Sequence, residues 1–271
     1  MIMENSFNNS YSLPEKKFKG NKKWWLLNEA SMKLMVGKIE VSGKENINKI
    51  PPNAKVIVMT THLTDLDMPI VVHAVAKDLD IVEMDMSPHH KLFGKQSEFG
   101  TNIGMRAIGM KNFLPIDYDK DDSGKKTSKT FNPDNFDPAV EIMEKGKAIL
   151  IAAHNPLTES AKNLDNVKGG YGGVYLAGLT GAYILPITVV LDKDAGIYGD
   201  GINTLKKKPN ASVVIGEPFQ FEKIDGIENL SKLIKNRDWR DEDFEEFSRL
   251  NKILNEKSKF VIKKMSEQLS K

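Results

Sequence analysis

Residues 55–61 read KVIVMTT, and residues 62–69 continue the chain as HLTDLDMP. The first stretch is apolar and rich in β-branched side chains with no polar alternation, which is typical of a parallel strand buried on both faces. Pro69 is tolerated in the first turn of a helix, so the sequence predicts a strand, a turn and then a helix over residues 69–76. In open α/β sheets, active sites lie at turns of this kind, where a strand ends.

Strand-like and helix-like stretches alternate on both sides of this unit. The other predicted strands are 38–42, 81–86, 113–116, 148–153, 184–191 and 212–215, and the predicted helices between them are 138–145 and 173–179. This alternation predicts an α/β fold with a mixed, largely parallel central sheet flanked by helices. Pro186 predicts that its strand is an edge or irregular strand, because proline has no N–H to donate.

Composition divides the chain into four segments. Residues 1–13 are polar and rich in Asn and Ser, which predicts a disordered lead-in. Residues 14–38 combine lysines with two tryptophans and a Leu/Met run, and two interpretations stay open: an amphipathic helix on a membrane surface, or a helix packed on the domain with a solvated lysine face. Residues 39–223 form the predicted α/β domain, and residues 224–271 a C-terminal helical extension with apolar residues every three to four positions.

The composition also limits the classes of function. The 271 residues include no cysteine, which excludes disulfides, thiolate catalysis and cysteine-bound metal centres. No stretch approaches the roughly 18–20 apolar residues of a membrane-spanning helix, and the first residues lack the order of a secretory signal. We therefore expect a protein that is soluble or attached to a membrane surface without crossing it. We further expect it to be cytoplasmic and peripheral on the inner face of the membrane, without a nucleic-acid partner.

His62 follows the 55–61 strand directly. A histidine in such a turn can act as a general base near neutral pH, provided that a carboxylate fixes its tautomer. Asp65 and Asp67 both offer that carboxylate, and spacing alone does not choose between them. In the alternative interpretation, His62 is a surface turn residue and Asp67 is a helix N-cap.

A metal-dependent hydrolase built on His62, Asp65 and Asp67 is a second hypothesis. However, no His-x-His or His-Glu-x-x-His spacing occurs in the chain. The adjacent histidines at 89 and 90 would point to opposite faces of a strand. We therefore expect no metal.

Two later stretches also place polar or glycine residues between a strand and a helix. Residues 154–160 read HNPLTES after the 148–153 strand, and residues 168–173 read KGGYGG before a predicted helix. Hydroxyls in the first stretch can contact a substrate, and backbone N–H groups in the second can receive a phosphate. The alternative for both is a conformational need of the turn itself.

Taken in order, these stretches resemble the glycerolipid acyltransferase family, the lysophosphatidate (1-acylglycerol-3-phosphate) acyltransferases and their relatives. The residues that carry the resemblance are 43–46 and 55–69 for the opening and the His-x4-Asp block, 102–117 and 149–160 for the second and third blocks, 172–186 for the fourth, and 213–218 for the ending. The resemblance spans about residues 40–220.

The resemblance implies an enzyme that moves a fatty acyl group from acyl-CoA or acyl carrier protein to a hydroxyl of a lysophospholipid or related lipid, without a cofactor. It implies that His62 is the general base and that Asp67, rather than Asp65, orients it. The substrate-binding residues that it implies are Thr158, Ser160 and Gly172, and Lys111, Lys120 and Lys168 are candidates to bind the acceptor where the family has arginines.

Two blocks depart from the family pattern. In the third block, Pro156-Leu157 replace a Glu-Gly pair and Glu159 replaces an arginine, and in the second block Tyr118 stands where an arginine is usual. In the family these residues help to hold the acceptor through its phosphate, and lysine does not reproduce the bidentate geometry of arginine. The resemblance thus implies the catalytic pair but not the usual acceptor, and a non-catalytic lipid-binding relative is a third hypothesis.

Overall fold

A mixed eight-stranded sheet forms the centre of the computed structural model, which describes residues 22–64, 66–86, 113–116, 132–154, 167, 169–192, 208–235 and 240–269. The strands are β1 (Ile39–Ser42), β2 (Val56–Thr60), β3 (Ile81–Met86), β4 (Phe113–Ile116), β5 (Ala148–Ala152), β6 (Tyr183–Leu191), β7 (Ala211–Ile215) and β8 (Phe219–Gln220). Their order is β1-β7-β6-β2-β5-β3-β4, with β8 also paired to β6. Strands β6, β2, β5, β3 and β4 are parallel, whereas β7 and β8 run antiparallel to β6. The predicted fold class is confirmed.

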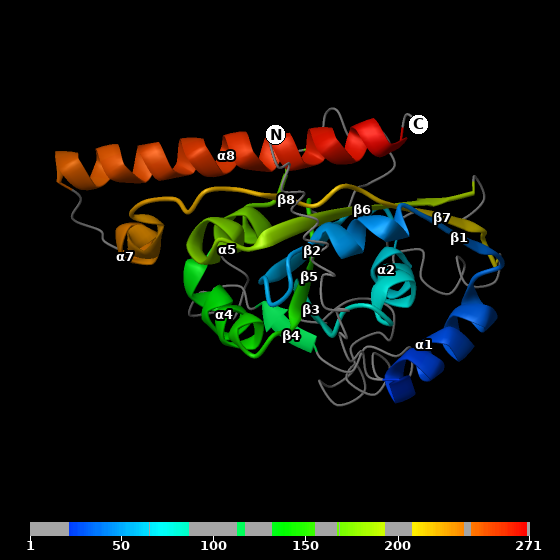
Figure 1. Cartoon of the computed structure of the whole chain (residues 1–271). Helices are drawn as coiled ribbons and strands as arrows, with labels where there is room; N and C mark the ends of the chain where they lie inside the picture. Colours follow the sequence, from blue (N-terminus) through cyan, green and yellow to red (C-terminus); the bar gives the residue numbers. More distant parts are fainter. Residues whose placement is uncertain are drawn as a thin grey trace, which may run out of the picture.

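Helices cover both faces of the sheet (Figure 1). They are α1 (Lys22–Met35), α2 (Asp67–Val75), α4 (Asp137–Glu144), α5 (Gly172–Thr180), α7 (Leu230–Lys235) and α8 (Asp241–Leu269), with short 3-10 turns at η1 (Lys44–Lys49), η2 (Pro133–Phe136) and η5 (Ile227–Asn229). Helices α1 and α2 share a hydrophobic core with one face of the sheet, and α4, α5, α7 and α8 share a second core with the other. Among the described residues, no helix combines the length and apolarity that crossing a bilayer requires.

Strand β2 lies in the middle of the sheet, and all five of its residues are buried. Val56 and Val58 belong to the core under α2, whereas Ile57 and Met59 belong to the core under α5. Because both faces are covered, each side chain of the strand is removed from water, which is worth about 1.5–3 kcal/mol for a large aliphatic group. This explains the unbroken apolar run, and it fixes the strand that carries the candidate site.

Pro186 predicts an edge or irregular strand; β6 is not an edge strand, because it lies between β7 and β2, but its pairing on one side is divided between β8 and β7 around Pro186. Tyr183 donates its amide to Lys55 and Ile187 accepts from Thr61, so these odd-numbered positions of β6 bond toward the β2 side. Pro186 has the opposite orientation, and its carbonyl accepts from Gly216 beyond β7. The missing N–H therefore faces the gap between the β8 pairing at residues 183–184 and the β7 pairing at residues 187–191.

The predicted C-terminal helical extension contains η5, α7 and α8, whereas residues 224–226 form a turn before η5. Along α8, Leu250, Leu254, Val261 and Met265 are buried in the core that α5 and β5 share, as their spacing predicts. Phe244 keeps the same spacing but is 58% exposed. The segment boundaries at residues 39, 223 and 224 stay predictions, and the lead-in over residues 1–13 lies outside the described residues.

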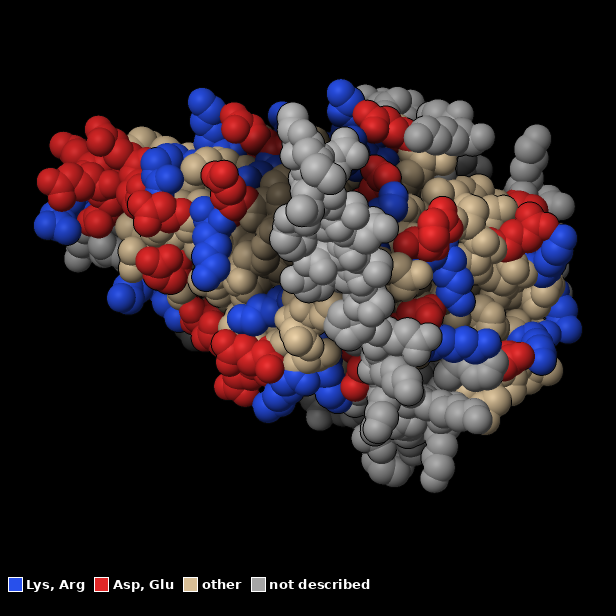
Figure 2. All heavy atoms as spheres, viewed as in Figure 1, with Lys and Arg blue, Asp and Glu red and all other residues tan. Residues whose placement is uncertain are grey.

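Helix α8 begins with acidic residues, which interact favourably with the positive end of a helix dipole. Figure 2 shows acidic side chains gathered at the end of the molecule where α8 starts. The exposed members of the first turn and a half are Asp241, Glu242 and Glu245. Further along α8, the Lys257 ammonium lies 4.1 Å from the ring centre of Phe221, a cation–π contact.

Candidate active site

The candidate site begins where the chain leaves β2. Thr61 still donates its amide to the Ile187 carbonyl (3.3 Å), and its hydroxyl accepts from the Val189 amide (3.1 Å). His62 follows with 5% of its surface exposed. The first part of the turn is thus anchored to β6, and the imidazole of His62 is carried in a buried position at the carboxyl end of a central strand.

The Asp67 carboxylate closes the turn that contains His62. Its Oδ2 accepts from the amides of Leu63 (2.5 Å) and Thr64 (3.1 Å), and its Oδ1 accepts from the Thr64 hydroxyl (2.6 Å). The same hydroxyl oxygen accepts from the amide of Leu66 (3.2 Å). Asp67 is completely buried, so these three hydrogen bonds take the place of the water that a carboxylate would otherwise require.

This geometry contradicts the alternative interpretation of the turn. A capping aspartate accepts from the amide of the second or third helical residue. Here Leu66 occupies the N-cap position, Asp67 is the first helical residue, and its carboxylate points back to amides before the helix. His62 is buried rather than on the surface. The structure thus brings His62 and Asp67 together in one closed turn.

His154 is a member of this site that the sequence did not identify. It follows β5, the strand beside β2, and its Nε2 accepts from the backbone amide of His62 (3.2 Å). Only 2% of His154 is exposed. The signal in the sequence was a second histidine directly after a strand, but its meaning depends on β2 and β5 being neighbours.

Most of the predicted substrate-binding residues lie outside the described part of the chain. They are Lys111, Lys120, Thr158, Ser160 and Lys168, and the alternative carboxylate Asp65 lies outside it too. Their roles stay predictions.

Gly172 is described, and it is the first residue of α5. A Cβ atom there would lie 2.7 Å from the ring of Phe136 and 2.9 Å from Cδ1 of Ile151. At the next position, a Cβ on Gly173 would lie 2.7 Å from the sulfur of Met59 in β2. At both positions a larger residue would force neighbouring side chains to move, and the glycines let the start of α5 approach β2 closely. Substrate binding by Gly172 stays a prediction.

Within the described ranges, no three His, Asp or Glu side chains lie close enough together to hold a metal ion. The metal-dependent hydrolase hypothesis also needs Asp65, about which the described ranges say nothing. On α2, His73 is half-buried, and this burial lowers the pKa of its imidazole. It carries no assigned role and is a useful control for the histidines of the site.

No protein-family model matches the chain, and no curated protein matches it in sequence. Among solved structures, the chain is similar to the crystal structure of the 1-acyl-sn-glycerophosphate (LPA) acyltransferase PlsC from Thermotoga maritima. The two are 15% identical, the alignment covers 79% of this chain and 74% of that one, and the TM-score is 0.47.

Proposed function

We propose that this protein is an O-acyltransferase of the lysophosphatidate acyltransferase type, with His62 as general base and Asp67 as the residue that orients it. The observation that carries the proposal is the buried turn at the carboxyl end of β2. There the Asp67 carboxylate binds the two amides that follow His62. The ordered sequence blocks from residue 40 to residue 220 support the same assignment.

In the proposed reaction, His62 accepts the proton of an acceptor hydroxyl while the oxygen attacks the carbonyl carbon of an acyl thioester. The new C–O ester bond forms, the C–S bond breaks, and the thiolate of CoA or acyl carrier protein takes the proton back from His62. The buried negative charge of Asp67 favours the imidazolium that exists between these two proton transfers. No covalent enzyme intermediate and no cofactor enter this scheme.

The acceptor in this proposal is a lysophospholipid or a related lipid. Thr158, Ser160 and the amide groups near Gly172 are proposed to contact it or the developing oxyanion, and Lys111 and Lys168 to replace the missing arginines. Lysine binds phosphate as a point charge without the bidentate geometry of arginine. An acceptor that differs from the family's usual one is therefore part of the proposal.

Helix α1 is proposed to hold the protein on a membrane surface. One side of the helix packs inward through Asn28 and Met32, and the Asn28 side-chain amide donates to the carbonyl of Pro69 in the first turn of α2 (3.4 Å). Leu26 and Leu34 are 51% and 71% exposed. Exposed leucines beside lysines suit insertion into a headgroup layer, and α2 connects this helix directly to the catalytic turn.

Acyl transfer by the purified chain tests the proposed function. Labelled acyl-CoA and acyl carrier protein are each offered with a series of lysophospholipids, and the products are identified by mass spectrometry. We expect His62→Ala to reduce the rate by about 10²–10⁴-fold, the usual contribution of a general base, whereas His73→Ala keeps it. Equal rates for wild type and His62→Ala would refute the assignment. Liposome binding without transfer to any acceptor favours the lipid-binding relative, and loss of activity with a chelator favours the hydrolase.

Vesicle sedimentation tests the membrane surface. We expect the wild type to bind vesicles that contain anionic phospholipid, and Leu26→Gln with Leu34→Gln to bind them less, because apolar area that enters the membrane is lost. A matched control replaces Phe244, which is also exposed but lies at the start of α8. If Phe244→Gln weakens binding as much as the α1 variant, the surface lies elsewhere.

A further inference from the structure

We propose that His154 is a positioning residue for the catalytic turn: held as the Nδ1–H tautomer, it fixes the backbone of His62 through Nε2. The catalytic consequence of this inference rests on the proposed function, whereas its structural part does not. It starts from the way in which the hydrogen-bond ladder between β2 and β5 ends.

The regular ladder stops one bond before His62. In a parallel pair, the amide of His62 would be the next donor to β5, and the Ala153 carbonyl would accept it. The preceding bond, from the Ala153 amide to the Thr60 carbonyl (2.8 Å), is formed. However, the Ala153 carbonyl accepts from Gly170 (2.7 Å) instead, and the His62 amide donates to the His154 ring (3.2 Å). A side chain has thus replaced the backbone acceptor at the point where the catalytic turn begins.

This contact determines the protonation of the His154 ring. A backbone amide can only donate, so the Nε2 atom that faces it carries no proton. In a neutral imidazole the remaining proton is then on Nδ1. Protonation of both nitrogens would direct two N–H groups at each other in a nearly water-free position, since His154 is 2% exposed.

Residues 169–170 and helix α8 hold His154 in its position. His154 pairs with Gly169 in an isolated antiparallel bridge. The hydroxyl of Ser258, buried in the middle of α8, donates to the carbonyl of Gly170 (3.2 Å). A Cβ on Gly169 would lie 1.9 Å from that hydroxyl oxygen, so only glycine lets the chain lie this close to α8. Contacts therefore run from α8 through residues 169–170 and His154 to the backbone of His62.

Loss of this support displaces the base without removing it. A displacement of about 1 Å in a reacting group can cost about a hundredfold in rate. His154 is proposed to act on the position of the base and not on substrate binding. We therefore expect the loss of His154 to lower kcat rather than to raise KM.

The tautomer is measured first, on the whole ¹⁵N-labelled chain, by long-range ¹H–¹⁵N correlation of the imidazole rings at neutral pH. His154 is assigned by the signals that disappear in His154→Gln. We expect the pattern of a neutral ring protonated at Nδ1, and a shifted His62 backbone amide in His154→Leu. A ring protonated at Nε2 overturns the proposal, whether or not acyl transfer has been found.

The kinetic consequence is measured with His154→Leu and His154→Gln. Leucine fills much of the ring volume but cannot accept, and we expect kcat to fall at least about tenfold, with KM within about twofold. Glutamine presents an oxygen acceptor near the position of Nε2 and should recover much of kcat. His73→Leu is the control, because that ring lies on α2 and has no assigned role. Wild-type kcat in His154→Leu overturns the inference while leaving the proposed function standing. If wild type transfers no acyl group, the proposed function fails and the tautomer measurement alone decides the inference.

Discussion

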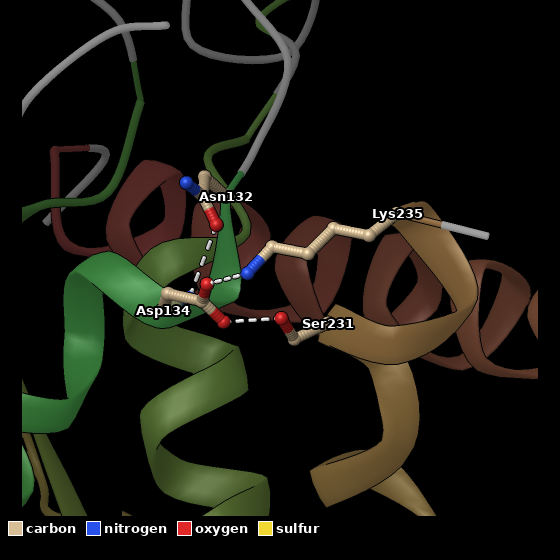
Figure 3. A network of polar contacts seen from close by, with 4 residues as sticks. All are labelled: Asn132, Asp134, Ser231 and Lys235. Carbon is tan, nitrogen blue, oxygen red and sulfur yellow. Dashed lines mark hydrogen bonds and ion pairs between the residues drawn. The ribbon is translucent and has the colours of Figure 1, made fainter. Parts of the chain in front are cut away.

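Two carboxylates of this chain, Asp67 and Asp134, each accept a hydrogen bond from a hydroxyl and further bonds from N–H donors, but one is buried and the other is partly exposed. Asp67 is completely buried and accepts from two amides and the hydroxyl of Thr64. Asp134 accepts from the Ser231 hydroxyl and the Lys235 ammonium, both on α7, and its side chain is 38% exposed (Figure 3). Its own amide donates to the Asn132 side chain (3.1 Å).

The exposure of each carboxylate to water decides how much its hydrogen bonds contribute to the stability of the fold. Water competes for Asp134 and Lys235, so an ion pair of this kind contributes about 0–1 kcal/mol. Water does not reach Asp67, and breaking any one of its bonds leaves a buried donor or acceptor unsatisfied, at about 1–3 kcal/mol. The comparison teaches that the number of hydrogen bonds around a carboxylate predicts little until burial is known.

The largest expected difference comes from removing the two charges. In Asp67→Asn, the remaining oxygen can still accept from the amides of Leu63 and Thr64, but an NH₂ group replaces Oδ1, which accepts from the Thr64 hydroxyl, and the negative charge is lost. We expect the free energy of unfolding to fall by about 1–3 kcal/mol and acyl transfer to fall by at least about a hundredfold. Asp134→Asn should cost less than about 1 kcal/mol and leave activity unchanged. Urea unfolding and the acyl-transfer assay measure both. Equal losses in the two variants would contradict the comparison.

The next difference comes from the two hydroxyl donors. Thr64→Val keeps the shape of the side chain but removes the donor to Asp67 and the acceptor for Leu66, so we expect a loss of about 1–2 kcal/mol and lower acyl transfer. Ser231→Ala removes the matching hydroxyl from Asp134 at a partly exposed position, with an expected loss below about 0.5 kcal/mol. Thermal unfolding of both variants compares the pair. A more costly Ser231→Ala would show that exposure is a poor guide here.

A packing change at the start of α5, which lies against β2, is expected to cost an intermediate amount of stability. Gly172→Ala places a Cβ 2.7 Å from the Phe136 ring, and overpacking of this kind costs about 1–3 kcal/mol. Gly146→Ala is the matched control, because a Cβ there meets nothing within 4 Å, although its positive φ of 79° adds backbone strain. Denaturant midpoints separate the two costs. If Gly172→Ala costs no more than the strained control, the contact with Phe136 is softer than the structure indicates.

The smallest expected effect is the pH dependence of the exposed network. The hydrogen bonds from Lys235 and Ser231 hold the pKa of Asp134 below its ordinary value of 3.8. A lowered folded-state pKa contributes stability that is present above the unfolded pKa and is lost as the pH falls through the folded one. The stability difference between wild type and Asp134→Asn should therefore exist at pH 7, amount to less than about 1 kcal/mol, and disappear as the pH falls through the lowered pKa of Asp134. A difference that grows toward acid pH would reverse the sign and refute this account.

Local sequence patterns predicted most of the sheet. The strands at 81–86 and 113–116 have the predicted bounds. Each of the other predicted strands differs from its prediction by one residue at one end or at both ends. Periodicity and β-branched runs are properties of neighbouring residues, so they can be recognised without knowledge of the fold. The two-residue strand β8 escaped prediction because so short a strand has no periodicity of its own.

The order of the strands was decided only in the tertiary structure. Pro186 indicated an edge or irregular strand, and β6 is in fact central. The proline is tolerated there because the missing N–H faces the gap between β8 and β7. Likewise, β1 pairs with β7 across a separation of about 170 residues, which no local pattern encodes.

The sequence by itself determined the strand at 55–61, the turn behind it and the candidate pair of His62 with a nearby carboxylate. Only the tertiary structure decided how the Asp67 carboxylate is used, since folding alone turns it back onto the amides of Leu63 and Thr64. It also brought His154 to the His62 backbone from 92 residues away. The physical reason is that composition and spacing report what a side chain can bind, whereas burial and strand order decide which partners remain once water is excluded.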